Sequence, residues 1–346
     1  MHVFELSLDE VAISAEICTF HEYPGESFLA VGTVTGQNLH PAKGEDRFVI
    51  AGIRLFRLSG RQLDYLNTTE VTSPPTALCA FDGRLLAGIG NGMVLFDLGK
   101  KQLLRKCELK GLPSFVTFIC VQGGERVVIG DASDSCFFVH YSKLENAFHV
   151  FADDVTSRMS NVADMVDYNS VAVGDRNGSV FVLRLPAGAT GDDTKSRAAA
   201  QRPNAWDQSQ TTNAPHKLDL VCHFYVGETI TGIRKCQLST GHSETLVYST
   251  VFGTIGTLCP FPSRDDLDFF AHLELHMRKY HVNLVGRDHL QFRSYYAPCK
   301  QVVDGDLCEM FSKLDTTMQQ KIAKEMEKTP LEIIKRVEDA RALVLW

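Results

Sequence analysis

The segment DGRLLAGIGNGMVLFDL, residues 82–98, decides the fold, because it holds two apolar runs, each preceded by a turn. Three later segments repeat this pattern: GERVVIGDASDSCFFVHY (124–141), YNSVAVGDRNGSVFVLRL (168–185) and SETLVYSTVFGTIGTLCPF (243–261). The first three copies start 42 and 44 residues apart. The fourth starts 75 residues later, or about 45 once a polar insertion of about 30 residues is left out. Repeats of about 40–45 residues indicate propeller blades of four strands each.

A fifth, weaker copy precedes these four. ESFLAVGTVTGQ (26–37) pairs with RFVIAGIRLFRL (47–58) across a loop rich in glycine, proline and charge. Strand interiors hold Val, Ile, Leu and Phe on both faces, which favours sheets stacked face to face. About 210 residues in repeats of about 42 predict five blades.

Three dipeptides between the apolar runs indicate tight hairpins. They are Asp82-Gly83, Asn91-Gly92 and Asn177-Gly178. These residue types tolerate the positive φ that both central positions of a tight hairpin turn require. We therefore expect positive φ at all of these positions.

From Ser263 onward the apolar period becomes helical. SRDDLDFFAHLELHMRKY has Ser263 as a candidate N-cap and places Arg278 and Lys279 near its C-terminus, where cations suit the helix dipole. Further helices are expected at 306–314, 317–328 and 330–343. The sequence thus predicts a β domain over residues 1–262 and a small α-helical domain over residues 263–346.

The last predicted helix has the clearest start signal. Thr329 is its N-cap, Pro330 its first residue and Glu332 its third, which together form a capping box with proline in its preferred place. Its apolar positions form one stripe, so the helix is expected to pack on another element. The basic side chains of this region are expected on outer faces: Lys321, Lys324, Lys328, Lys335 and Arg336.

The joint between the two parts is RDHLQFRSYYAPCKQVVDGDLCEMFSKLD, residues 287–315. Its aromatic residues Phe292, Tyr295 and Tyr296 are expected to anchor an extended segment that Pro298 ends. Asp304-Gly305-Asp306 then supplies a turn and an N-cap for the next helix.

Composition excludes several classes of function. The net charge of −7 and pI near 5.9 argue against binding nucleic acid through a broadly basic surface. Ten cysteines without a CxxC pair, and no secretory leader, are typical of reduced core residues in a cytosolic or nuclear protein. The sequence contains no run of 18 apolar residues, which a helix would need to span a membrane. We therefore expect no membrane partner.

Possible catalytic and cofactor motifs have simpler explanations. His272 and His276 flank Glu274, but zinc proteases place the glutamate directly after the first histidine, so no metal is expected. The glycines of AGIGNGMV are followed by another strand, whereas a dinucleotide site needs a helix there. A carboxylate pair could be sought among Asp153, Asp154, Asp164, Asp167 and Asp175. Acids at blade turns ordinarily accept hydrogen bonds from turn amides. We therefore expect no cofactor and no small-molecule substrate.

A basic and aromatic cluster occupies the joint: Arg287, His289, Phe292, Arg293, Tyr295, Tyr296 and Lys300. Arginine and aromatic side chains of this kind stack on single-stranded RNA. The same aromatics would also be buried if they anchored the joint or docked a partner, which is the interpretation we favour. The polar insertion, residues 186–217, is predicted to be a mobile loop, and its Trp206 is a candidate docking anchor.

Several stretches resemble a known family. They are LFDLGKKQLLRKCELK (95–110), FADD (151–154), VGETI (226–230), DFFAHLELHMR (268–278), GRDHLQFRSYY (286–296), DGDLCE (304–309) and TPLEIIKRVEDAR (329–341). They are similar to the large multi-propeller proteins, which include large subunits of the cleavage and polyadenylation specificity factor and of the damaged-DNA-binding complex. The resemblance is greatest to the C-terminal part of splicing factor 3b subunit 3.

The resemblance implies a mostly β fold, a WD40-like β-propeller of seven blades that is only partly present here, followed by a helical domain. It implies a nuclear, non-catalytic scaffold of the U2 small nuclear ribonucleoprotein that supports branch-site selection. The implied partners are the HEAT-repeat subunit and the small subunits of splicing factor 3b, with RNA contact more indirect than direct. Since five blades do not close a ring of seven, we expect the rest of a longer chain, or a second chain, to supply the missing blades.

The residues expected to bind partners or join the domains come from the joint, the first helix and the polar insertion: Arg287, Asp288, His289, Phe292, Arg293, Tyr295, Tyr296, Asp304, Asp306, Leu307, Phe269, Phe270, His272 and Trp206. Three alternatives to the splicing scaffold stay open at this point. One is an adaptor of a cullin ubiquitin ligase, and another is a subunit of the mRNA 3′-end cleavage complex. The third is a propeller hydrolase or lyase, which would need acids or histidines on the inner strands of several blades.

Overall fold

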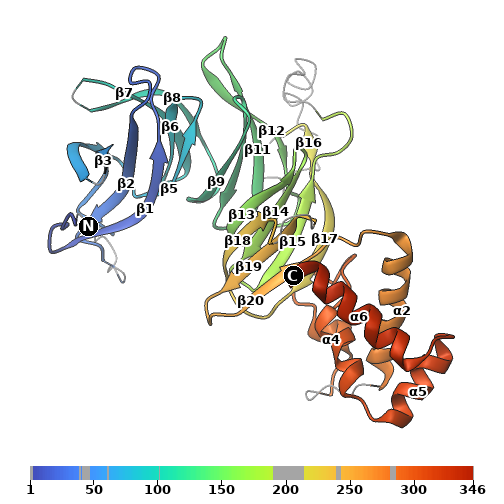
Figure 1. Ribbon diagram of the computed structural model, residues 1–346. Coiled ribbons are helices and arrows are strands. Elements are labelled where there is room, and N and C mark those ends of the chain that lie inside the picture. Colours follow the sequence, from blue (N-terminus) through green and yellow to red (C-terminus); the bar gives the residue numbers. More distant parts are fainter. Residues whose placement is uncertain are drawn as a thin grey trace. The chain divides into compact units, whose positions relative to one another are not determined.

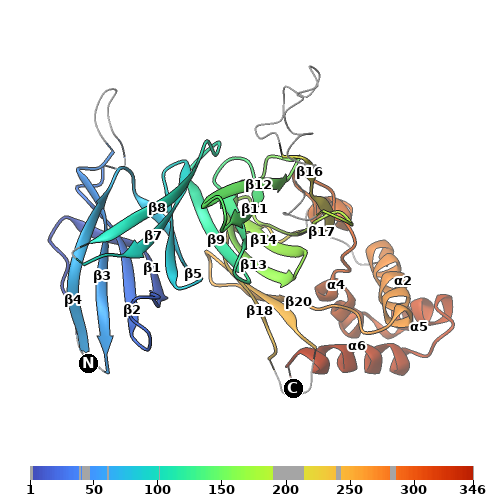
Figure 2. The same cartoon turned by 90° about the horizontal axis from the view of Figure 1, so that it is seen from above.

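The computed structural model describes residues 3–38, 40, 47–60, 62–100, 102–189, 214–238, 243–280 and 286–345. The chain divides into two compact units, which are described separately (Figures 1 and 2). The first unit comprises Met1–Asn169 and Arg184–Asp219, and the second comprises Ser170–Leu183 and Leu220–Trp346.

The first unit contains three sheets, each built from four antiparallel strands that follow chain order. The first sheet has β1 (Glu10–Cys18), β2 (Ser27–Thr35), β3 (Ile50–Ser59) and β4 (Gln62–Val71). The second has β5 (Pro75–Phe81), β6 (Arg84–Ile89), β7 (Gly92–Leu98) and β8 (Leu103–Lys110). The third has β9 (Val116–Gln122), β10 (Arg126–Asp131), β11 (Cys136–Ser142) and β12 (Ala147–Asp153), and the unit adds β13 (Ser160–Asp167) and the short β16 (His216–Lys217).

Successive sheets of this unit are arranged as blades. The first strand of each sheet lies beside the first strand of the next, so β1 contacts β5, β5 contacts β9 and β9 contacts β13. One apolar core, with Phe28, Leu55 and Phe96, joins the first two sheets, and another, with Leu95, Val127 and Phe137, joins the second and third. The central strand β7 is buried along its whole length, because sheets cover both of its faces.

The second unit contains the remaining strands and all of the described helices. Its strands are β14 (Ser170–Asp175), β15 (Ser179–Arg184), β17 (Asp219–Tyr225), β18 (Ile230–Cys236), β19 (Thr245–Thr250) and β20 (Ile255–Leu258). Its helices are α2 (Arg264–Tyr280), α3 (His289–Phe292), α4 (Gly305–Glu309), the 3₁₀ turn η1 (Met310–Lys313), α5 (Thr316–Glu325) and α6 (Pro330–Leu345). The helices α2, α4, α5 and α6 form one bundle (Figure 1).

The structure confirms the mostly β fold with blade-type sheets and the repeats that predicted it. Each repeat of the sequence forms one hairpin: β6–β7, β10–β11, β14–β15 and β19–β20, with β2–β3 as the weaker copy. The described residues form five sheets, which equals the number of blades expected from the repeat length. The boundary expected between residues 262 and 263 stays a prediction, although β20 ends at Leu258 and α2 begins at Arg264.

The predicted turn chemistry holds at one hairpin of the three. Asp82 and Gly83 have φ of 42° and 63°. In the β6–β7 hairpin the turn is Gly90-Asn91 and not Asn91-Gly92, and Gly90 alone has positive φ, because Gly92 already pairs with Ile89. In the β14–β15 hairpin only Gly178 has positive φ, since its connection has three residues and one left-handed position suffices.

The helix starts follow the sequence signals. The hydroxyl of Ser263 accepts a hydrogen bond from the amide of Asp266 (3.1 Å), as an N-cap does. The capping box also forms, because the Thr329 amide donates to the Glu332 carboxylate (2.8 Å) and the Glu332 amide donates to the Thr329 hydroxyl (3.3 Å). The predicted helix 306–314 is shorter and irregular, since α4 gives way to η1 at Met310.

Two other expectations need correction. The segment expected to be extended begins as the helical turn α3, where the amides of Gln291 and Phe292 both donate to the carbonyl of Asp288 (2.9 and 3.1 Å). The insertion predicted over 186–217 includes residues 190–213, which lie outside the described part, but its end forms β16, which pairs in parallel with β12. All ten cysteines are free, yet only Cys18, Cys136 and Cys308 are fully buried, and Cys259 is exposed.

Candidate functional site

Asp304 is the centre of a buried polar cluster in the second unit. Its side chain is the N-cap of α4, with Oδ1 accepting from the amides of Asp306 (3.1 Å) and Leu307 (3.4 Å). The other oxygen, Oδ2, accepts from Nε2 of His289 (2.7 Å) and Nε of Arg293 (2.6 Å). With only 2% of the residue exposed, Asp304 therefore ties α3 to α4 through a single carboxylate.

The electrostatics of this cluster follow from its donors. Burial alone would raise the pKa of Asp304, but the hydrogen bond from His289 and the charge of Arg293 outweigh it, so the pKa is lowered. Glu274 on α2 accepts the amide of Asp304 (3.2 Å), and burial raises the pKa of this second carboxyl. Asp304 is thus the ionised partner of Arg293, while Glu274 is held in a site that disfavours its charge.

Arg293 is held between rings as well as carboxylates. Its guanidinium carbon lies 4.9 Å from the ring centre of Phe224 on β17 and 5.2 Å from that of Phe292. Nη2 also reaches Oδ2 of Asp306 at 3.4 Å. A cation that is both ion-paired and stacked fixes the orientation of the helical turn that carries it.

The aromatic residues that follow lie along strand β17. Tyr295 stacks on Tyr225, with ring centres 5.5 Å apart and an angle of 18°. Tyr296 meets His223 edge to face, at 5.5 Å and 75°. His223 and Lys300 exchange two backbone hydrogen bonds (3.0 and 2.9 Å). Residues 293–300 therefore form a strap along β17, and this name is kept below.

A second buried carboxylate holds the strap. The Tyr296 hydroxyl donates to Oδ2 of Asp175 at the end of β14 (2.7 Å), and the Ser179 amide donates to Oδ1 (2.6 Å). Asp175 is fully buried, and burial raises its pKa despite these donors. As expected for an acid at a blade turn, Asp175 accepts turn amides; its bond to Tyr296 was not anticipated.

The sequence repeats contain a signal that Asp175 is a buried hydrogen-bond acceptor. The copies VVIGD and VAVGD place Asp131 and Asp175 at the same position of their blades. Asp131 is also fully buried and accepts the amides of Ser114 and Ser133 (3.1 Å each). Its Oδ2 thus binds a backbone amide where Asp175 binds the tyrosine. Comparing the repeats would have marked Asp175 as a buried acceptor, though not its partner.

The structure brings together part of the predicted candidate set. His289, Arg293, Tyr296, Asp304 and Leu307 lie in or against the cluster and strap. Asp288 pairs instead with Arg278 (2.9 Å), while Arg287 and Phe292 are exposed.

The remaining candidates lie on the helices or outside the described residues. Phe269 and Phe270 are buried in the helical core, whereas His272 lies exposed on α2. Trp206 lies outside the residues that the structure describes. Sequence reasoning considered Glu274 only as part of a metal motif, and it passed over His223 and Phe224, which carry no motif of their own.

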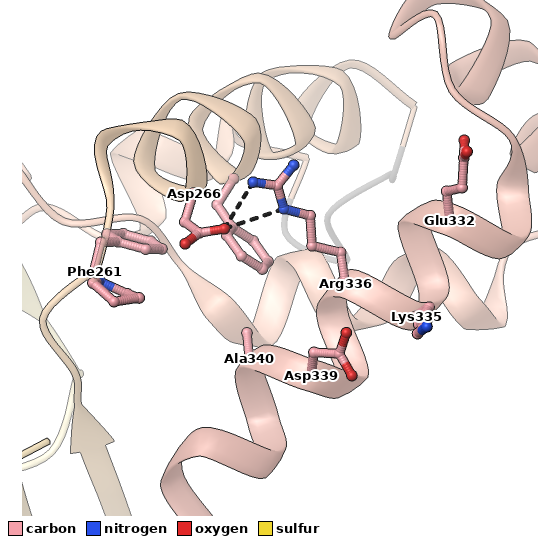
Figure 3. A pocket seen from close by; sticks show the side chains of 9 residues that line it. Phe261, Asp266, Glu332, Lys335, Arg336, Asp339 and Ala340 are labelled. Atoms are coloured by element: carbon pink, nitrogen blue, oxygen red, sulfur yellow. Dashed lines mark hydrogen bonds and ion pairs between the residues drawn. The ribbon is translucent and has the colours of Figure 1, made fainter. Parts of the chain in front are cut away.

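A groove between α2 and α6 was not anticipated either. Arg336 was expected on an outer face, but its guanidinium binds Asp265 (2.9 Å) and Asp266 (2.8 Å) and lies 4.5 Å from the ring centre of Phe269. Both aspartates lie at the start of α2, and Figure 3 shows the contact of Arg336 with Asp266. Beside this contact is a cavity of about 410 Å³, lined by Phe261, Pro262, Phe270, Lys335, Asp339 and Ala340 among others.

The chemistry of these residues is that of anchoring. In the part of the chain that the structure describes, no three or more His, Cys, Asp or Glu residues are grouped so that they could hold a metal ion. Among the same residues, no helix is both long and apolar enough to cross a membrane. The carboxylates of the cluster and strap are occupied by helix caps, turn amides and cationic side chains.

Blade-type sheets, with a strap along β17 that leads into a helical bundle, define a protein of the propeller class. The chain belongs to the family described as the CPSF A subunit region, whose model matches residues 1–313. The resemblance inferred from the sequence is thereby confirmed.

Curated relatives cover nearly all of this chain. It is 42% identical over 99% of its length to spliceosome-associated protein 130 A of Arabidopsis thaliana. It is 41% identical over 96% to a probable splicing factor 3B subunit 3 of Dictyostelium discoideum, and 40% over 99% to splicing factor 3B subunit 3 of Danio rerio. The chain spans only 26–28% of the length of these relatives.

Proposed function

We propose that this chain acts in pre-mRNA splicing as a non-catalytic scaffold of the splicing factor 3b complex in the U2 small nuclear ribonucleoprotein. The observation that carries the proposal is identity of 40–42% over nearly the whole chain to relatives named as splicing factor subunits. The geometry supports it, because the charged side chains of the joint hold elements in place and are not arranged around an open reaction site.

Within this proposal the chain works in the nucleus through protein contacts that support branch-site recognition. Its partners are the HEAT-repeat subunit and the small subunits of splicing factor 3b. The contacting residues that we propose are four exposed members of the candidate set: Arg287, Phe292, Tyr295 and His272. Contact with RNA is indirect, in keeping with a net charge of −7 and with the burial of Arg293 in an ion pair.

The test is an affinity purification of the tagged chain from nuclear extract, followed by mass spectrometry. We expect the HEAT-repeat subunit and the small subunits to copurify. Enrichment of a cullin, or of the mRNA 3′-end cleavage complex, in place of these subunits would reject the proposal for one of the adaptor alternatives. A labelled branch-site RNA should not be retained by the purified chain alone.

A matched pair of variants tests the contacting surface. The variant Arg287→Ala removes an exposed side chain of the joint, and we expect it to recover less of the HEAT-repeat subunit at an unchanged melting temperature. Lys328→Ala, which is also exposed but lies near the end of α5, should recover as much as the wild type. Equal recovery with both variants would remove the joint from the contact surface.

A further inference from the structure

Two cysteines flank the bridge that joins the strap to β17. His223 and Lys300 form this bridge through their two backbone hydrogen bonds (3.0 and 2.9 Å). Cys222 directly precedes the first of these residues, and Cys299 directly precedes the second. Because neighbouring residues of an extended segment point to opposite faces, both cysteines lie on the face opposite to His223 and Lys300. The bridge therefore places the two thiols on the same face of one short ladder.

The register of the bridge makes the two cysteines diagonal neighbours. Cys222 lies opposite Gln301, and Cys299 is two residues earlier on the same strand as Gln301. Diagonal neighbours have Cα atoms about 7–8 Å apart, whereas a disulfide needs about 4.4–6.8 Å. Gln301 has a φ of 50°, so the ladder ends directly after the bridge. Since one bridged pair is all that fixes the register here, a small shift of the strap brings the cysteines within disulfide distance.

The thiol of Cys299 points toward the end of the bridge where Cys222 lies. Its Sγ donates a weak hydrogen bond to the carbonyl of Val302, just beyond the bridge (3.9 Å). Burial raises the pKa of Cys299 to about 11, and the charges of Glu274 and Asp304 and the nearby Cys222 add to this shift. Cys222 is thus within electrostatic reach of Cys299, in agreement with the register.

These two cysteines differ from the cysteines of the core. A cysteine that serves as a small apolar core residue is fully buried, as Cys136 is, whereas Cys222 and Cys299 are only half-buried. Cys136 also has an electrostatic contact with a second cysteine, Cys120. That pair lies on β11 and β9, which β10 separates, so it cannot form a bond without unfolding of the sheet. It serves as an internal control for the pair at the strap.

We propose that Cys222 and Cys299 form a reversible disulfide that fastens the strap to β17 when the chain meets a hydroperoxide. One sulfur attacks the O–O bond of hydrogen peroxide, takes the hydroxyl group as a sulfenic acid and releases one water. The other thiol displaces that hydroxyl group as a second water, and the S–S bond forms. The thiols lose two electrons and two protons, and the peroxide is reduced. Disulfides of intracellular proteins are typically transient and redox-sensing. The inference does not rest on the splicing proposal.

The test is peptide mapping of the oxidised chain. The reduced, purified chain is treated with hydrogen peroxide, its remaining thiols are alkylated, and it is digested with trypsin without reductant. We expect residues 218–234 to be linked to residues 294–300, since each of these tryptic peptides contains a single cysteine. Dithiothreitol should separate the two peptides. The linked chain should melt roughly 5 °C higher, because the bond closes a long loop.

Variants and the internal control complete the test. Cys222→Ser and Cys299→Ser should each abolish the linked product and the rise in melting temperature. Cys259→Ser removes an exposed thiol of the same unit and should behave as the wild type does. If a serine variant does not fold, the wild-type product alone decides.

Three results would overturn the proposal. The first is no linked product at peroxide concentrations that oxidise Cys259. The second is an equal yield of the link when peroxide is added in urea, or a link between Cys120 and Cys136, because oxidation would then not follow the folded geometry. The third is a linked chain whose melting temperature is unchanged.

Discussion

At the scale of single residues, two buried aspartates have opposite pKa shifts for a clear physical reason. Asp304 and Asp175 are both almost inaccessible to solvent. Asp304 accepts from His289 and from the cationic Arg293, which outweigh the cost of burial and lower its pKa. Asp175 accepts only neutral donors, and burial raises its pKa. Burial therefore decides the sign of the shift only where no cation opposes it.

Asp304→Asn tests the first of these carboxylates. The amide can still cap α4, but Arg293 loses its buried counter-charge, so we expect a loss of about 3 kcal/mol in unfolding free energy near neutral pH. Because the folded pKa lies below 3.8, the contribution of Asp304 is fully present above that pH and is lost as the pH falls through the lowered pKa. Urea unfolding followed by circular dichroism should show the difference from wild type shrinking only at such acidic pH.

The control for this variant is Asp306→Asn. Asp306 also reaches Arg293, but at 3.4 Å and with its own side chain largely exposed. An exposed ion pair of this kind contributes little, so a change of less than about 0.5 kcal/mol is expected. If the two variants lost equal stability, Asp304 would not be the centre of the cluster.

Tyr296→Phe tests the second carboxylate and the strap. Removal of the hydroxyl leaves Asp175 with its turn amides only, at an expected cost of about 1–3 kcal/mol. The raised pKa of Asp175 means that its charge costs stability above that pKa and that stability recovers as the pH falls through it. The deficit of the variant should therefore become smaller in acid, as measured by urea unfolding.

Tyr295→Phe is the neighbouring control. Tyr295 contributes its ring, stacked on Tyr225, which the substitution keeps. We expect its unfolding free energy to stay within about 0.5 kcal/mol of the wild type. A loss as large as that of Tyr296→Phe would mean that both hydroxyl groups hold the strap.

At the scale of elements, the sequence predicts what depends on local chemistry. Thr329 and Glu332 each accept a hydrogen bond from the other's amide within one helical turn, so their spacing alone was sufficient to predict the capping box. The turn expected at Asn91-Gly92 lies instead at Gly90-Asn91, because Ile89 pairs with Gly92. This register depends on both strands of the hairpin, so the turn residues alone could not predict it.

Contacts across long separations escaped prediction. Arg336 finds Asp265 and Asp266, which lie about 70 residues earlier in the chain, and Tyr296 finds Asp175 across 121. Nothing in the sequence next to either residue marks such a partner. Some candidate residues of the joint bind one another, as His289 and Asp304 do, whereas the sequence indicated no partner for Tyr296 on β14 or β17.

Thr329→Ala tests the capping box. Without its hydroxyl the first turn of α6 loses one partner for an amide, and we expect a loss of about 1 kcal/mol in unfolding free energy. Thr329→Ser keeps the hydroxyl and should restore most of this stability. If serine were no better than alanine, packing of the threonine methyl group, and not capping, would be the source of the effect. Thermal unfolding followed by circular dichroism measures both.

At the scale of the whole molecule, the two units are interleaved in the sequence. The chain passes between them at Asn169–Ser170, Leu183–Arg184 and Asp219–Leu220. The even spacing of the repeats gives no hint of this, because residues 168–185 resemble their neighbours in the first unit as closely as those in the second. The assignment of the β14–β15 hairpin to the second unit depends on long-range contacts, such as the bond from Tyr296 to Asp175.

This interleaving sets an order of events during synthesis. The β14–β15 hairpin ends near Leu183, whereas the second unit resumes at Leu220, which is 37 residues later. At ribosomal rates of about 5–20 residues per second, the hairpin waits roughly 2–7 s for that part of the chain, and longer for Tyr296. Until then Asp175 lacks its tyrosine donor. The growing chain thus passes through a stage at which an apolar hairpin is complete before the later segments of its own unit have been made.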